Sequence, residues 1–203
     1  MTRLGEKGAI RKPRGPTIPV AIVYPNVYRV GMGNLGFQFL YHYLNAHPRF
    51  SAERFFSPHP RRNEKGHERG PLSEESHRRL TDFTLIAFSV PFENDYPAIP
   101  GTLLAAGIPP FQKDRNSSDP LVIAGGISVS INPEPVAPFL DLVFVGEVET
   151  SGEEDGFFSR LADVLLSTSR GDGHERGIFD QFRGVPGVYV PSAYHFAARC
   201  LVP

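Results

Sequence analysis

The sequence is poorest in cysteine and tryptophan, since its 203 residues include one cysteine, Cys200, and no tryptophan. A single cysteine cannot form an intramolecular disulfide, and it cannot build an all-cysteine metal site by itself. An excess of charge of one sign is also missing, because 21 basic residues nearly balance 22 acidic ones. This balance gives no electrostatic reason to expect a nucleic-acid or membrane partner.

Long apolar runs are absent as well. No segment approaches the roughly 20 apolar residues that a membrane-spanning helix needs. The basic residues 1–15 are followed by no apolar core, so they do not resemble a secretory signal. The seven histidines show no spacing typical of metal ligands. We therefore expect a cytoplasmic protein, and the sequence suggests neither metal-binding nor catalytic residues.

Glycine and proline, at 20 residues each, divide the chain into short segments. Five segments are rich in β-branched, aromatic or other apolar residues, which is typical of strands. They are residues 19–24, 50–56, 84–90, 121–124 and 141–145. Helical patterns lie between them, and strands that alternate with helices predict a parallel sheet covered on both faces. We expect a flavodoxin-like (Rossmann-like) three-layer α/β/α fold with five parallel strands in the order 2-1-3-4-5.

The predicted helices begin at polar residues. Asn34 is placed to cap a helix with an apolar face, and Ser73 is placed to cap a short helix that ends near Leu80. A further amphipathic helix is expected over residues 151–167. The chain then divides into an N-terminal arm (1–16), an α/β domain (17–168), and a linker with a short C-terminal β extension (169–203). Within the extension, residues 185–194 fit either a small hairpin or an added edge strand.

Distinctive residues follow the predicted strands at the edge where the strands end. In open α/β sheets, ligands bind outside the carboxyl ends of the strands, so this edge is the predicted binding site. The candidate residues are Asn26, Tyr28, Gly31, Ser89, Gly125, Gly126 and Glu147. The glycine pair has no Cβ and would let a ligand approach the backbone closely, although glycines at this position can also simply turn the chain.

Residues 31–36 read GMGNLG, a formal match to the dinucleotide fingerprint GxGxxG. In that fingerprint the first glycine stands at the strand end, so that the pyrophosphate meets the helix N-terminus. Here residues 25–30 intervene between the strand and Gly31. A glycine-rich turn is the simpler interpretation, and a nucleotide-binding Rossmann-type domain is kept as an alternative.

Several of these segments together carry a family resemblance. YPNVYRVGMGNLGFQFLYHYLN (24–45), ERFF (53–56), FSVPFENDYPAI (88–99), VIAGGISVSINPEPVAPFLD (122–141) and VGEVE (145–149) resemble the N-terminal cobalamin-binding-like domain of uncharacterised radical SAM proteins. The resemblance extends from about Thr17 to Pro191. Its last part, GVYVP at 187–191, resembles the segment that leads into the radical SAM barrel.

The resemblance implies a cobalamin site that differs from those of related domains at one important position. Related cobalamin domains carry Asp-x-His-x-x-Gly, Ser-x-Leu and Gly-Gly after strands one, three and four. Here Asn26 to Gly31 stand at the first motif, Ser89 begins the second, and Gly125-Gly126 match the third. Tyr28 takes the place of the histidine that ligates cobalt, and a protonated phenol is a poor metal ligand. The resemblance thus implies that any cobalamin is bound without a histidine ligand from the protein.

A radical SAM enzyme holds its 4Fe-4S cluster with three cysteines, and this chain has one. The resemblance therefore implies that S-adenosylmethionine and the cluster belong to a catalytic domain outside this chain, in cis or as a separate chain. The expected function is an accessory domain that holds a corrinoid or a substrate over that barrel. The alternatives are an interaction or scaffold module without a ligand and the nucleotide-binding domain considered above.

Overall fold

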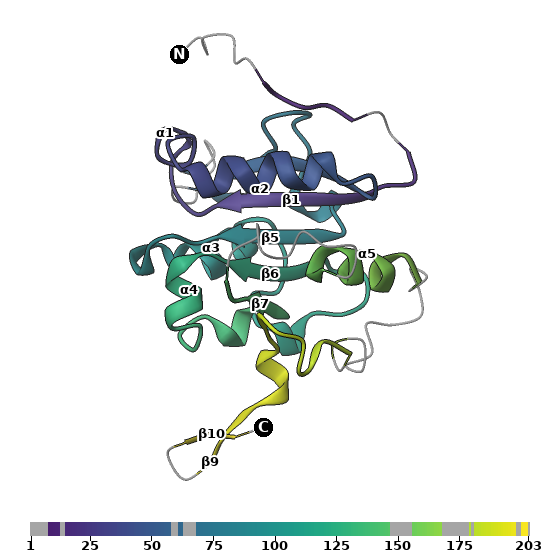
Figure 1. Ribbon diagram of the computed structural model, residues 1–203. Helices are drawn as coiled ribbons and strands as arrows, with labels where there is room; N and C mark the ends of the chain where they lie inside the picture. Colours follow the sequence, from purple (N-terminus) through teal and green to yellow (C-terminus); the bar gives the residue numbers. More distant parts are fainter. Residues whose placement is uncertain are drawn as a thin grey trace.

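The structure is a computed structural model that describes residues 8–12, 15–57, 61–62, 68–146, 156–167, 179, 181–197 and 200–202. Its centre is one six-stranded sheet (Figure 1). In spatial order the strands are β2 (Phe50–Phe56), β1 (Ile18–Tyr24), β5 (Leu85–Ser89), β6 (Leu121–Gly125), β7 (Leu142–Phe144) and β8 (Val188–Tyr189). All neighbours are parallel except β7 and β8, which are antiparallel.

The predicted α/β class is confirmed, but the strand count and order differ from the five-stranded prediction. β8 continues the sheet beyond β7, with Val188 opposite Phe144. Gly187 permits the chain to turn back, because its φ of +75° is one that residues with a Cβ rarely adopt. Its carbonyl accepts a hydrogen bond from the Val145 N–H at 2.7 Å. Of the two interpretations of residues 185–194, the added edge strand is the one observed.

Helices cover both faces of the sheet. α2 (Leu35–Ala46) and α5 (Phe157–Ser167) pack with β1, β2 and β7 in one apolar cluster. α3 (Ala98–Ala105) and α4 (Ile127–Ile131) belong to a second cluster on the opposite face. Each strand alternates its side chains between these clusters, as Val20 and Ile22 do on one side and Ala21 and Val23 on the other. The apolar strand segments of the sequence are thus explained by burial on both faces.

The remaining elements are short. They are α1 (Tyr28–Gly31), the 3-10 turns η1 (Leu80–Asp82), η2 (Glu93–Asp95), η3 (Gln112–Asp114), η4 (Ala137–Phe139) and η7 (Pro191–Ala193), and two hairpins outside the main sheet. The hairpins pair β3 (Arg61–Arg62) with β4 (Glu68–Arg69) and β9 (His195–Ala197) with β10 (Cys200–Val202). The sequence did not predict these hairpins. The first part of the linker predicted after residue 168, up to residue 178, lies outside the described residues.

The predicted cap of α2 is confirmed, whereas the helix predicted after Ser73 is wrong. The Asn34 side-chain oxygen accepts a hydrogen bond from the Phe37 N–H at 2.9 Å. Residues 74–76 form a turn instead of a helix. The reason is Glu75, which is only 3 % exposed and accepts hydrogen bonds from the N–H and the Nε of Arg54 at 2.7 and 2.6 Å. This tertiary pairing overrides the local capping pattern.

Side chains and a turn cover the outer edge of β2. Lys12 Nζ donates to the Phe50 carbonyl, and the Asn45 side chain both donates to and accepts from the backbone of Ala52. Glu75 accepts from the Arg54 N–H, while the Glu74 N–H donates to the Arg54 carbonyl. Along the outer edge of β2, backbone groups of Phe50, Ala52 and Arg54 therefore have hydrogen-bond partners without pairing with another strand.

None of the helices that the structure describes combines the length and the apolar character needed to cross a bilayer.

Candidate functional site

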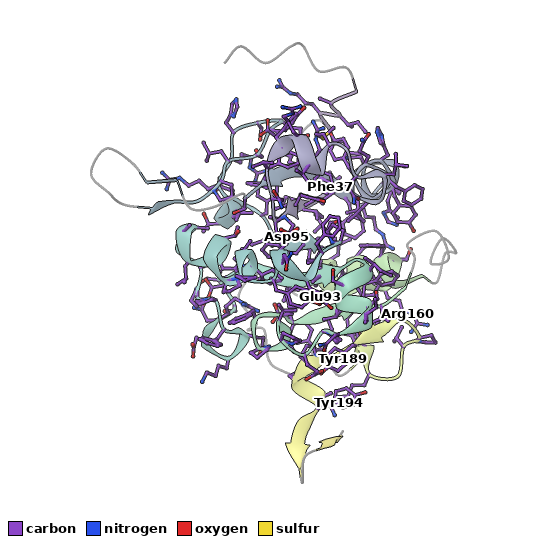
Figure 2. The ribbon with its side chains drawn as sticks, turned by 90° about the vertical axis from the view of Figure 1, so that its left-hand side faces the viewer. Phe37, Glu93, Asp95, Arg160, Tyr189 and Tyr194 are labelled. Atoms are coloured by element: carbon purple, nitrogen blue, oxygen red, sulfur yellow. The ribbon has the colours of Figure 1, made fainter. Side chains whose placement is uncertain are left out.

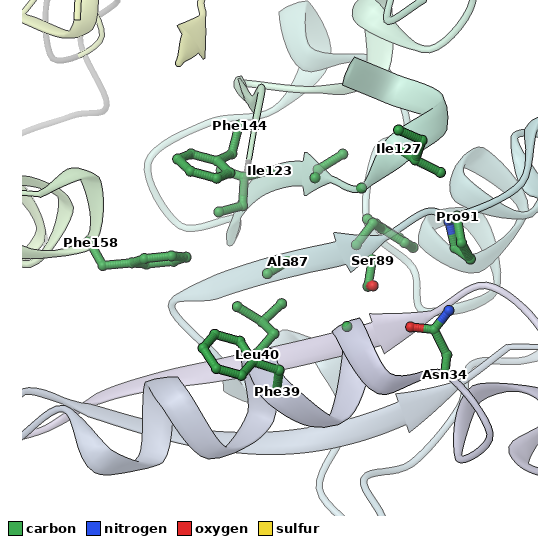
Figure 3. Close-up of a pocket in the computed structure, with 16 residues that line it drawn as sticks. Asn34, Phe39, Leu40, Ala87, Ser89, Pro91, Ile123, Ile127, Phe144 and Phe158 are labelled. Carbon is green, nitrogen blue, oxygen red and sulfur yellow. The ribbon is translucent and has the colours of Figure 1, made fainter. Parts of the chain in front are cut away.

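A cleft of about 550 Å³ opens at the edge where the parallel strands end (Figure 3). It lies over β5, β6 and β7, and α2 and α5 form its walls. α2 packs along β2, whereas α5 contacts the sheet through Phe158, whose ring lies against Phe50 and Phe144. The stretch of β5 and β6 closest to the carboxyl edge is consequently left open to a ligand.

The interior of the cleft is apolar. Ala87 and Ile123 form its floor, and the side chains of Phe39, Leu40, Phe144 and Phe158 surround it (Figure 3). Three aromatic rings around a small residue on the floor create a space suited to a flat, apolar group. Polar groups lie nearer the strand ends, where Asn34 and Ser89 line the cleft.

Gly125 and Gly126 both line the cleft, but the structure gives them different roles. Gly125 follows Ile123 by two residues in β6 and therefore faces the cleft. A Cβ on Gly125 would make only ordinary contacts, the nearest being 3.6 Å from the Phe144 carbonyl oxygen. Gly126 has φ +118°, and a Cβ there would lie 2.6 Å from the Val90 carbonyl oxygen. Gly125 provides clearance within the cleft, while Gly126 is required by the backbone.

Three of the predicted site residues lie in the segment between β1 and α2, and they do not line the cleft. Asn26 donates from Nδ2 to Oδ1 of Asp95 at 2.9 Å, which ties this loop to the loop after β5. The Tyr28 ring packs edge-on against Phe56, with centroids 5.0 Å apart. Gly31 is buried so tightly that a Cβ would lie 2.5 Å from the Phe56 ring. Tyr28 and Gly31 thus pack against β2, whereas Asn26 joins this segment to the loop after β5.

Of the seven predicted residues, the cleft thus brings together Ser89, Gly125 and Gly126. Glu147 lies outside the described residues. The residues that sequence reasoning missed are the aromatic walls and Ala87. A signal for Ala87 was present in the sequence, because alanine is the one small side chain in the otherwise bulky run LIAF.

Two buried polar atoms near the end of β1 lack hydrogen-bond partners among the described residues. They are the Tyr24 hydroxyl and Oδ2 of Asp95. Burial raises the pKa of the Asp95 carboxyl above its usual value, and the hydrogen bond from Asn26 opposes this shift. Burial also raises the pKa of Tyr24, the Asp95 charge adds to that effect, and Asn34 opposes it. Tyr24, Asn34 and Asp95 are therefore electrostatic neighbours beside the cleft.

Within the described part of the chain, His, Cys, Asp and Glu side chains form no group of three that could hold a metal ion. The described lining of the cleft consists of apolar and uncharged polar residues. Such a lining suits an organic ligand bound by shape, apolar contact and a few hydrogen bonds.

Comparison with known proteins supplies the family context. A sequence model of the family described as "Radical SAM proteins, N-terminal" matches residues 36–191. A protein of Methanocaldococcus jannaschii that is described as uncharacterised is 24 % identical over 165 residues. That alignment covers 80 % of this chain but 29 % of the relative, so this chain corresponds to a minor part of the relative's length. No solved structure matches the chain significantly.

Proposed function

Because the chain belongs to the family of N-terminal regions of radical SAM proteins, we propose that it is an accessory domain that binds a corrinoid in the cleft. The observation that carries the proposal is the apolar cleft at the carboxyl edge of a mostly parallel sheet, lined by Ser89 and Gly125. The order of the parallel strands also supports a flavodoxin-like arrangement, in which ligands bind at this edge.

The residues of the cleft fit the nucleotide tail of a corrinoid. The tail ends in a flat, largely apolar base, and the rings of Phe39, Phe144 and Phe158 offer matching surfaces. The volume of about 550 Å³ falls within the range common for small-molecule sites. Gly125 leaves room for the base, and the Ser89 hydroxyl lies at the strand end. A bound corrinoid would supply cobalt-centred chemistry, while this chain would supply binding and orientation.

Tyr28→Phe is expected to leave retention of hydroxocobalamin nearly unchanged. The Tyr28 ring packs against Phe56, and a protonated phenol is a poor metal ligand, so we expect no coordination of the cobalt by its hydroxyl. The measurement is retention after gel filtration together with the absorption spectrum of the bound pigment. Coordination of the cobalt by a protein nitrogen or phenolate would contradict this proposal.

Gly125→Leu tests the site directly. The side chain would enter the cleft, and the Cβ would meet no close backbone atom, so we expect lost hydroxocobalamin retention with little change in the thermal midpoint. Gly101→Leu is the matched control, since a Cβ at Gly101 on α3 meets no atom within 4 Å and lies away from the cleft. Wild-type retention by Gly125→Leu would show that the cleft is not the binding site.

The catalytic partner follows from family membership. Three cysteines are needed for a radical SAM cluster, and this sequence has one. S-adenosylmethionine and the 4Fe-4S cluster are therefore assigned to a radical SAM catalytic domain, in cis or as a separate chain. The chain described here would present its bound ligand to that domain.

Apolar side chains exposed at the carboxyl edge favour a second function, that of an interaction module. They follow β1, β5 and β6 and are Val27, Val30, Leu35, Phe92, Ile127 and Ile131. In this alternative the edge docks on the catalytic domain and the cleft binds nothing, so wild-type protein retains no hydroxocobalamin. The nucleotide-binding alternative has weaker support, because packing against Phe56 accounts for Gly31 without a nucleotide.

A further inference from the structure

The segment from Pro91 to Tyr96, called the switch segment below, exposes an apolar side chain and buries a carboxylate, the reverse of an ordinary surface loop. Phe92 is 56 % exposed, while Asp95, three residues later, is 8 % exposed. Apolar side chains normally take the buried positions and carboxylates the exposed ones. Figure 2 looks onto the edge where the strands end and shows Asp95 near its middle. The arrangement is therefore a local departure at the candidate site.

The buried carboxyl group is only half satisfied. Oδ1 of Asp95 accepts the hydrogen bond from Asn26, but Oδ2 has no partner among the described residues. The Tyr24 hydroxyl lies close enough to this carboxyl that the Asp95 charge raises the pKa of Tyr24. A buried polar atom without a hydrogen bond destabilises the conformation that contains it. Burial also raises the pKa of Asp95, because it disfavours the charged form of the carboxyl.

The ends of the switch segment are held more firmly than its middle. At one end, Ser128 Oγ donates to the Val90 carbonyl at 3.0 Å. At the other end, the Tyr96 hydroxyl donates to the Asn132 carbonyl at 2.8 Å. Between them, the Asn26–Asp95 hydrogen bond is the one that joins the segment to another part of the described chain. The segment can thus rearrange between fixed ends by breaking a single long-range hydrogen bond.

Phe92 is close enough along the chain to reach the cleft, because its neighbour Pro91 lines the cleft directly. A ligand in the cleft would add apolar surface next to Phe92. We propose that the switch segment turns over when the cleft is occupied, so that Phe92 covers the ligand and Asp95 leaves the interior. This inference rests on the proposed function, since the occupant is the ligand of the same cleft.

Asp95→Asn is the test variant, and Glu93→Gln, at an exposed carboxylate in the same segment, is its control. Asparagine still accepts the hydrogen bond from Asn26, and a neutral amide costs less to bury than a carboxylate. The conformation with residue 95 buried is then more stable in the variant than in the wild type. We expect a higher thermal midpoint and slower hydrogen exchange of residues 91–96. We also expect hydroxocobalamin affinity to fall about tenfold, because closing the segment over the ligand becomes more costly. Glu93→Gln should change none of these.

The outcomes separate this inference from the proposed function. A lower midpoint, unchanged exchange or undiminished affinity in Asp95→Asn would overturn the switch while leaving corrinoid binding intact. If the wild-type chain retains no hydroxocobalamin, the proposed function fails and hydrogen exchange alone decides the inference. Slower exchange of residues 91–96 in Asp95→Asn than in wild type would then support the motion, and equal rates would refute it.

Discussion

Glu75→Ala is expected to lower the free energy of unfolding by about 3–5 kcal/mol, the cost typical of breaking a buried ion pair by removing one partner. Glu75 and Arg54 are each 3 % exposed, and their side chains are joined at 2.6 Å. The variant loses the carboxylate that neutralises the buried guanidinium. It also removes the acceptor of the Arg54 N–H at the edge of β2. Denaturant unfolding of the wild type and the variant measures the difference.

A double variant separates the two contributions of Glu75. Arg54→Met combined with Glu75→Leu removes both charges and keeps apolar volume, so it should recover part of the loss. The backbone N–H of residue 54 still lacks its acceptor in the double variant. The free energy of unfolding of this variant should therefore stay below that of the wild type. An unchanged unfolding midpoint in Glu75→Ala would mean that the ion pair contributes nothing to the stability of the fold.

Gly126→Val is expected to produce the second large loss of stability. The backbone at Gly126 has φ +118° and ψ 168°, a region that is nearly exclusive to glycine and costs other residues about 1–3 kcal/mol. The added Cβ would also overlap the carbonyl of Val90, the residue directly before the switch segment. We expect a clearly lower thermal midpoint with or without hydroxocobalamin.

The neighbouring glycine provides the contrast for this experiment. Gly125→Leu should change retention and not stability, whereas Gly126→Val should change stability first. A wild-type midpoint in Gly126→Val would contradict the structural role of this residue. The two variants therefore assign separate roles to a pair that the sequence alone presents as a unit.

The parts of the fold that were predictable depend on local signals. β2 spans Phe50–Phe56, as predicted, because the segment contains three phenylalanines and a proline follows shortly after it. α2 begins after Asn34 because that side chain caps the helix. The location of the cleft followed from topology, since the ends of parallel strands meet at one edge of the sheet. Ser89, Gly125 and Gly126 were predicted at this edge in the same way, and they line the cleft.

The parts that could not be predicted depend on contacts between distant residues. The helix expected after Ser73 is replaced by a turn because Glu75 pairs with Arg54, 21 positions away. Asn26 and Tyr28 follow β1 as expected, but contacts with Asp95 and Phe56 hold them outside the lining of the cleft. Likewise, β8 is two residues long and becomes a strand only through its pairing with β7.

The covered edge of β2 has a consequence for the order in which the chain is synthesised. The groups that cover it come from Lys12, Asn45, Glu74 and Glu75, all of which precede β5 in the sequence. A chain emerging from the ribosome at about 5–20 residues per second can therefore finish the outer edge before β5 exists. The uncovered inner edge of β1 is the one that β5 later occupies. Of the two edges of the β2–β1 pair, the half-made protein thus leaves open the one that pairs with its own next strand.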